Sequence, residues 1–118
     1  MSNLARSITV FGIYLLIAGA CFIFIPNIIL PLLGFAPTTE VWIRLLGLLT
    51  ANIGIYFLYS VRHDDRHFYR ATLYTRLIFF SGVILFVIFK LASPLLILFG
   101  LVDLAGAAWT WTALRSQK

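Results

Sequence analysis

The chain alternates long apolar runs with short polar segments. Four of these runs are candidate membrane-spanning segments, and they cover residues 8–25, 41–60, 71–89 and 95–112. A helix rises about 1.5 Å per residue, so each run is about long enough to cross a hydrocarbon core of roughly 30 Å. The segments between the runs are short, so successive helices should cross in opposite directions. The pattern predicts an all-α membrane protein with four antiparallel transmembrane helices in one bundle, forming a single domain over residues 1–118.

A shorter apolar segment follows the first run. It extends from Asn27 to Gly34 and is too short to span a membrane. Pro26 has no backbone N–H and should end or kink the helix before it. We therefore expect either a short helix lying in the membrane interface or a kinked continuation of the first span.

Two polar segments separate the later runs. The first contains Thr38 and Thr39, either of which can cap the next helix, and Glu40 is placed where the helix dipole favours an acid. The second covers residues 61–70 and is strongly charged. We expect it to be a short solvated loop between antiparallel helices.

Small residues indicate where two helices can approach closely in a membrane. The first run offers three such positions, at Gly12, Ala18 and Gly19. The second run carries a track of three more, at Gly47, Ala51 and Gly54. Both sets predict helix packing rather than a ligand site.

Composition supports a membrane location. The chain is 62% hydrophobic and 11% charged, whereas soluble domains carry about 25% charged residues. The net charge of +5 does not indicate nucleic-acid binding, because the charges lie mostly at the ends of the apolar runs. The single cysteine, Cys21, excludes an internal disulfide.

Basic residues are distributed unevenly between the two sides of the predicted bundle. One side carries Arg6, Arg62, Arg66, Arg70, Arg115 and Lys118. The other side carries only Lys90, together with Arg44 just inside a span. Cytoplasmic loops are enriched in Lys and Arg. We therefore predict a multi-pass protein of the bacterial inner membrane with both termini in the cytoplasm.

Asp103 is the one acid inside any apolar run. A carboxylate at membrane depth is costly and should face protein with a partner. On a helix its own face consists mostly of small residues, which allow another helix to come close. These neighbours are Phe99, Gly100, Gly106, Ala107 and Thr110.

Two arginines lie within reach of Asp103 in the predicted topology. We expect a cluster of Arg44, Asp103 and Arg76, in which Asp103 is ionised and paired with an arginine. Asn52, Thr72 and Tyr59 are expected around it. Two cations on one acid would leave a positive surplus that favours an anionic or carbonyl-bearing ligand, or ordered water. A structural ion pair and a functional site both fit this pattern.

Other candidate chemistry is weaker. His63 and His67 have the helical spacing of a metal-binding pair, but they are the only histidines and no third ligand is apparent. We therefore expect no metal and no cofactor. The sequence shows no nucleophile set and no glycine-rich phosphate loop. Four phenylalanines of the third run should face lipid or the core: Phe79, Phe80, Phe86 and Phe89.

Several short motifs resemble a known group. They are Trp42-Ile-Arg44-x-x-Gly47, Gly54-Ile-Tyr56, Arg62, Phe68, Thr75-Arg76 and Phe99-Gly-Leu-Val-Asp103-Leu-x-Gly106-Ala-x-Trp109-Thr110. This pattern resembles the small bacterial four-helix membrane proteins of the BphX-like and DUF4345-like group. The resemblance covers nearly the whole chain and implies the fold. The group has no settled biochemical function, so the resemblance implies no activity.

The sequence is most consistent with a non-enzymatic binding or accessory protein. Its partner would be a membrane lipid, a lipophilic small molecule or another membrane protein, and a homo-oligomer is also compatible with the chain. The alternative is a small oligomeric transporter or channel that uses Asp103 as its titrating or ion-pairing group.

Overall fold

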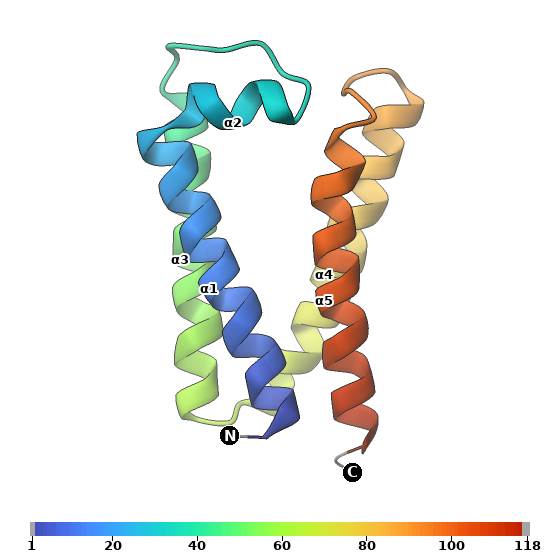
Figure 1. Cartoon of the computed structure of the whole chain (residues 1–118). Helices are drawn as coiled ribbons and strands as arrows, with labels where there is room; N and C mark the ends of the chain where they lie inside the picture. The colour runs from blue at the N-terminus through green and yellow to red at the C-terminus, as the bar shows by residue number, and fades with distance from the viewer. Residues whose placement is uncertain (1, 117–118) are drawn as a thin grey trace.

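The structure is a computed structural model that describes residues 2–116, and this part of the chain is all-helical (Figure 1). Four helices are long and apolar enough to cross a membrane. The predicted fold class, an all-α protein with four candidate spans, is confirmed. The helices are α1 (Asn3–Phe24), α2 (Pro26–Leu32), α3 (Trp42–Arg62), α4 (Arg66–Ile88) and α5 (Leu96–Ser116).

Two long helices begin earlier than predicted because polar side chains cap them. The Ser2 side chain accepts a hydrogen bond of 3.1 Å from the backbone N–H of Ala5, and this fixes the start of α1. Asp65 does the same for α4 through the backbone N–H of Phe68 at 3.1 Å. Much of the charged segment predicted as a loop is therefore helical, and the turn between α3 and α4 is short.

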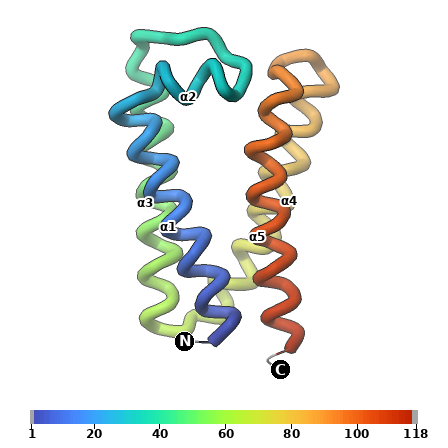
Figure 2. Tube along the Cα trace, in the orientation of Figure 1, coloured from blue at the N-terminus to red at the C-terminus, as the bar shows by residue number. Residues whose placement is uncertain are grey.

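The short helix α2 is separate from α1. Ile25 leaves the helical region, with φ −134° and ψ 49°, and Pro26 begins α2 at a position where no N–H is needed. Figure 2 shows α2 lying across the end of the long helices rather than along them. Of the two alternatives for this segment, the structure has a separate short helix.

The predicted threonine cap of α3 is wrong. The residue before α3 is Val41, and no side chain caps it. Thr38 instead accepts a hydrogen bond of 3.0 Å from the backbone N–H of Glu40, and its own N–H donates to the Asn27 side chain at 2.9 Å. Thr38 therefore stabilises the connection between α2 and α3 rather than the helix itself.

The long helices form two pairs rather than one evenly packed bundle. Helix α1 packs along α3, helix α4 packs along α5, and α1 also contacts α5. The pairs meet at the end of the molecule that holds both chain termini, which we call the joined end (Figure 1). They diverge toward the opposite end, which α2 crosses and which we call the roofed end.

Glycines bring the backbones of α1 and α3 together at two levels. A Cβ added to Gly19 would lie 2.6 Å from the carbonyl oxygen of Gly47. A Cβ added to Gly54 would lie 2.8 Å from the carbonyl oxygen of Gly12. The small residues predicted to mark helix contacts on each of these spans therefore face one another.

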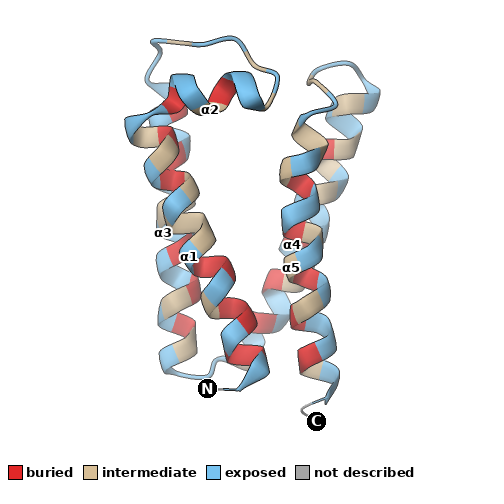
Figure 3. Ribbon diagram, in the orientation of Figure 1, coloured by how far each residue is buried: buried red, intermediate tan, exposed pale blue. Residues whose placement is uncertain are grey.

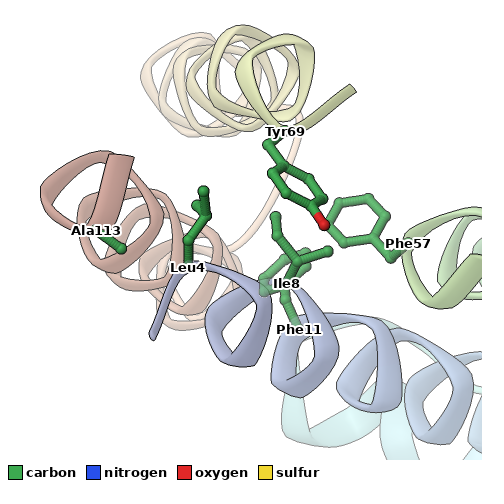
Figure 4. Close-up of a cluster of buried hydrophobic side chains, with 6 residues drawn as sticks. All are labelled: Leu4, Ile8, Phe11, Phe57, Tyr69 and Ala113. Carbon is green, nitrogen blue, oxygen red and sulfur yellow. The ribbon is translucent and has the colours of Figure 1, made fainter. Parts of the chain in front are cut away.

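Buried apolar side chains gather mainly at the joined end. Figure 4 shows this cluster, which draws on α1, α3, α4 and α5: Leu4, Ile8, Phe11, Phe57, Tyr69 and Ala113. A smaller cluster at the roofed end contains Phe22, Leu30 and Ile43. Figure 3 shows that the outward faces of all four long helices are exposed, as expected for helices surrounded by lipid.

Candidate functional site: an apolar cavity with a charged end

A cavity of about 590 Å³ lies between the two helix pairs. Side chains from all five helices line it, and nearly all of them are apolar. Binding sites for small molecules usually have volumes of roughly 300–1,000 Å³ and few polar groups. The polar residues of this cavity are also few: Thr50, Thr75, Arg76 and Asp103.

Arg76 of α4 is held firmly at the joined end of the cavity. Its side chain is only 3% exposed. Its Nε donates to the Thr72 carbonyl oxygen at 3.2 Å, and its Nη2 donates to the Thr72 hydroxyl at 2.8 Å. Nη2 also donates to the Thr110 hydroxyl of α5 at 3.1 Å. These bonds fix the guanidinium in one position between two helices.

Two aromatic rings also contact the Arg76 guanidinium. Its central carbon lies 4.7 Å from the ring centroid of Phe11 and 5.6 Å from that of Phe57. Both distances are within the range of a cation–π interaction. A Cβ on Gly106 would lie 2.8 Å from Phe11 and 3.2 Å from Nη1 of Arg76. The glycine therefore makes room for both side chains.

One nitrogen of Arg76 has no partner. Its Nη1 is buried and makes no hydrogen bond with any residue of the described range 2–116. Buried donors are nearly always satisfied in native proteins, and leaving one unsatisfied costs roughly 1–3 kcal/mol. Arg76, which lines the cavity, thus keeps one unsatisfied hydrogen-bond donor.

Thr110 connects three helices through side-chain hydrogen bonds. Its hydroxyl lies 2.9 Å from the Ser7 hydroxyl of α1 and also accepts from Arg76 of α4. Ser7, Thr110 and Arg76 are all buried. Sequence analysis missed Ser7 because it placed the start of the first span at residue 8. Its only signal was a small polar residue directly before an apolar run.

Asp103 of α5 lines the same cavity and is 8% exposed. Its carboxylate interacts electrostatically with Arg76 and Tyr14. It makes no hydrogen bond or ion pair with another residue of the described part of the chain. The predicted ion pair is therefore not formed as a direct contact, although the acid and one of the two expected arginines do line the same cavity.

Arg44 does not join this group. It is exposed, and its guanidinium donates to the backbone carbonyl of Ile23 near the end of α1. Asn52 and Tyr59 are exposed on α3 and do not line the cavity. The Tyr59 ring contacts the His63 ring instead, with centroids 4.8 Å apart.

The predicted six-residue group is therefore reduced to three. Arg76, Thr72 and Asp103 come together, whereas the other three expected members lie elsewhere on α3. This changes the expected electrostatics. One cation and one acid replace two cations and one acid, so the cavity has no surplus positive charge.

The two long sides of the cavity differ. On the side of α1 and α5, the Phe99 ring lies 6.1 Å from the Tyr14 ring and 6.2 Å from the Phe22 ring, which closes the gap between these helices. On the side of α3 and α4, lining residues such as Ile53 and Phe86 are 46% and 50% exposed. The cavity therefore opens to the surroundings between α3 and α4.

Helix α2 and the residues after it close the roofed end. Leu30, Leu33 and Phe35 line the cavity there. Gly34 has a φ of +87°, and a Cβ at this position would clash with the side chain of Ser93, in the turn between α4 and α5. The roof thus reaches from one helix pair to the other through a contact that only glycine permits.

Within residues 2–116, no three His, Cys, Asp or Glu side chains gather closely enough to hold a metal ion.

Known proteins do not identify the chain further. The resemblance to small bacterial four-helix proteins stays a prediction. Comparison with family models, curated proteins and solved structures finds no match for this chain.

Proposed function

We propose that this protein is a non-enzymatic membrane protein that binds a lipid or a lipophilic small molecule inside the cavity between its helix pairs. The observation that supports this is the cavity itself, with its apolar walls and one charged end formed by Arg76 and Asp103. Sites for small ligands combine an apolar lining with a few placed polar groups in this way.

The dimensions of the cavity suit a lipid chain. Ile43 and Phe57 line its opposite ends on α3, and they are separated by about 21 Å at about 1.5 Å per residue. One leaflet of a bilayer core is about 15 Å thick. An extended chain from one leaflet therefore fits along the cavity.

The position of the opening supports loading from the bilayer. Apart from Thr75, the exposed lining residues on α3 and α4 are apolar. A ligand moving sideways between these helices would meet a largely apolar environment. This route requires no passage through water.

The orientation of the protein follows from its charges, and we propose that the joined end faces the cytoplasm of a bacterial inner membrane. The basic residues of the α3–α4 turn and of both chain ends lie at this end. The α2 roof of the cavity then faces the exterior, and its charged end faces the cytoplasm. Reporter fusions after residue 118 and within residues 36–39 should report cytoplasm and exterior, respectively; the reverse result, or a mixed one, would contradict this orientation.

A matched pair of substitutions on α3 tests the binding function. Ile53 lines the cavity, whereas Ile55 does not, and their exposed fractions are similar at 46% and 53%. Ile53→Trp should fill the cavity and release bound lipid, while Ile55→Trp should leave binding unchanged. Native mass spectrometry of the protein released from nanodiscs would measure the bound lipid per chain.

Two outcomes would count against a binding function. One is that the wild-type protein retains no lipid beyond the level seen for Ile53→Trp. The other is that both tryptophan variants lose lipid equally, because that result would locate the lipid on the outer helix surface rather than in the cavity.

A further inference from the structure

We infer that the ligand is a single-chain lipid with an uncharged head group that both donates and accepts hydrogen bonds, and that this head group binds between Arg76 and Asp103. A hydroxyl or a primary amide has this chemistry. The inference rests on the proposed binding function and specifies its ligand class.

Arg76 supplies the donor. Its guanidinium is held by Thr72 and Thr110 and lies against two aromatic rings, so it cannot turn to find another partner. Its Nη1 is nevertheless buried without a hydrogen bond to any residue of the described chain. An arginine can only donate, so the group that satisfies it must carry an acceptor oxygen.

Asp103 supplies the acceptor. Its carboxylate lines the cavity and forms no hydrogen bond with another residue of the range 2–116. An ionised carboxylate only accepts hydrogen bonds. A ligand that offers an acceptor to Arg76 and a donor to Asp103 would therefore satisfy both residues, which a purely apolar ligand or a simple ketone would not do.

The charges of the cavity oppose a head group that carries a net charge of either sign. Asp103 opposes an anion and Arg76 opposes a cation, and Arg44, which donates to the Ile23 carbonyl, does not line the cavity. The depth of Arg76 in the membrane also disfavours a charged head group. Arg76 lies about 15 Å along α4 from Arg66, close to the middle of a core of about 30 Å, where an ionised head group is costly.

The shape of the cavity favours one chain rather than two. Phe99 closes the side between α1 and α5, so the only open side of the described cavity lies between α3 and α4. The volume of about 590 Å³ lies within the range for a single small ligand. One chain can extend from the charged end toward the α2 roof.

Four probes that differ only in their head groups test this inference. They are brominated forms of palmityl alcohol, palmitamide, palmitate and palmitylamine. Trp42 lines the cavity, so bromine in the chain should quench its fluorescence. With Trp109 and Trp111 replaced by Phe, Trp42 is the sole reporter. In nanodiscs, the alcohol and the amide should bind at least about tenfold more tightly than the acid and the amine.

An Asp103 variant then tests whether this carboxylate disfavours the negatively charged probe. Asp103→Asn removes the acid and leaves Arg76 as the only charge in the cavity, so the affinity for palmitate should rise at least about tenfold. Glu40→Gln is the matched control, because it removes the same charge from an exposed position outside the cavity. The control should keep the preference for uncharged probes.

The outcomes separate this inference from the binding function. If no probe quenches Trp42, both are wrong. If all four probes bind to the wild-type protein within about twofold, or if palmitate binds best, the cavity takes lipid but the head-group assignment is wrong. A failure of Asp103→Asn to gain affinity for palmitate would also contradict the assignment.

Discussion

The contact within the α1–α3 pair and the contact between the two helix pairs are built differently. Within the pair, glycines allow backbone-to-backbone contact at two levels, Gly12 with Gly54 and Gly19 with Gly47. Between the pairs, the Ser7–Thr110 hydrogen bond and a cluster of buried apolar side chains hold the joined end, and a cavity lies farther along. Lipid tails are as apolar as the side chains, so helix association in membranes depends on close packing and polar bonds. The cavity lies where neither is present.

The largest effect should come from breaking the glycine contact. Gly19→Leu places a side chain against the backbone of Gly47 and Ala51, which cannot give way. We expect a loss of about 3 kcal/mol in the free energy of unfolding, measured in detergent. Gly82→Leu is the control, because a Cβ there would meet nothing within 4 Å. Equal effects of the two variants would show that the glycine contact is unimportant.

A smaller effect is expected from the polar connection between the pairs. Thr110→Val removes the hydroxyl that Ser7 and Arg76 share, and this should cost about 1–3 kcal/mol. Thr50→Val is the control, since within residues 2–116 the Thr50 side chain bonds only to its own helix, at the Leu46 carbonyl. Unfolding in detergent measures both variants.

A double-mutant cycle sharpens this test. Ser7→Ala should cost less once Thr110 is already Val, because the two hydroxyls bond to each other at 2.9 Å. Strictly additive losses would mean that the two side chains act independently, and that they do not join α1 to α5.

The contact between Gly34 and Ser93 at the roofed end should affect the distance between the helix pairs more than it affects the free energy of unfolding. Gly34→Ala introduces a Cβ at positive φ and against Ser93, so we expect a loss of about 1 kcal/mol and a wider gap between the pairs. Spin labels on α2 and on the turn between α4 and α5 would measure the gap. Adding Ser93→Gly should restore the distance but not the full stability, because the backbone strain remains. An unchanged distance in Gly34→Ala would contradict the role of this contact.

The smallest effect on stability should come from the cavity. Asp103→Asn breaks no hydrogen bond or ion pair within the described chain, so the free energy of unfolding should fall by no more than about 0.5 kcal/mol. Relief of carboxylate desolvation would even stabilise the protein. A loss of about 3–5 kcal/mol would instead support a direct ion pair with an arginine, as expected from the sequence.

The sequence by itself determined the spans and the helix faces suited to close contact. Apolar runs of this length exclude a soluble surface, and small residues such as Gly19 and Gly47 are placed where backbones can touch. Pro26 was enough to predict that the first span ends or kinks there. These features depend on local chemistry and helical periodicity, so they can be read without knowing which helices are neighbours.

Only the tertiary structure decided how the charged residues are partnered. Helical spacing gives the face on which a residue lies, but it does not give the rotation and tilt of one helix against another. The packing of α4 on α5 placed Arg76 against Thr110, whereas Arg44 donates to Ile23 within the α1–α3 pair rather than to Asp103. Asp103 faces a cavity rather than a cation, because the two pairs diverge from the joined end toward the roofed end.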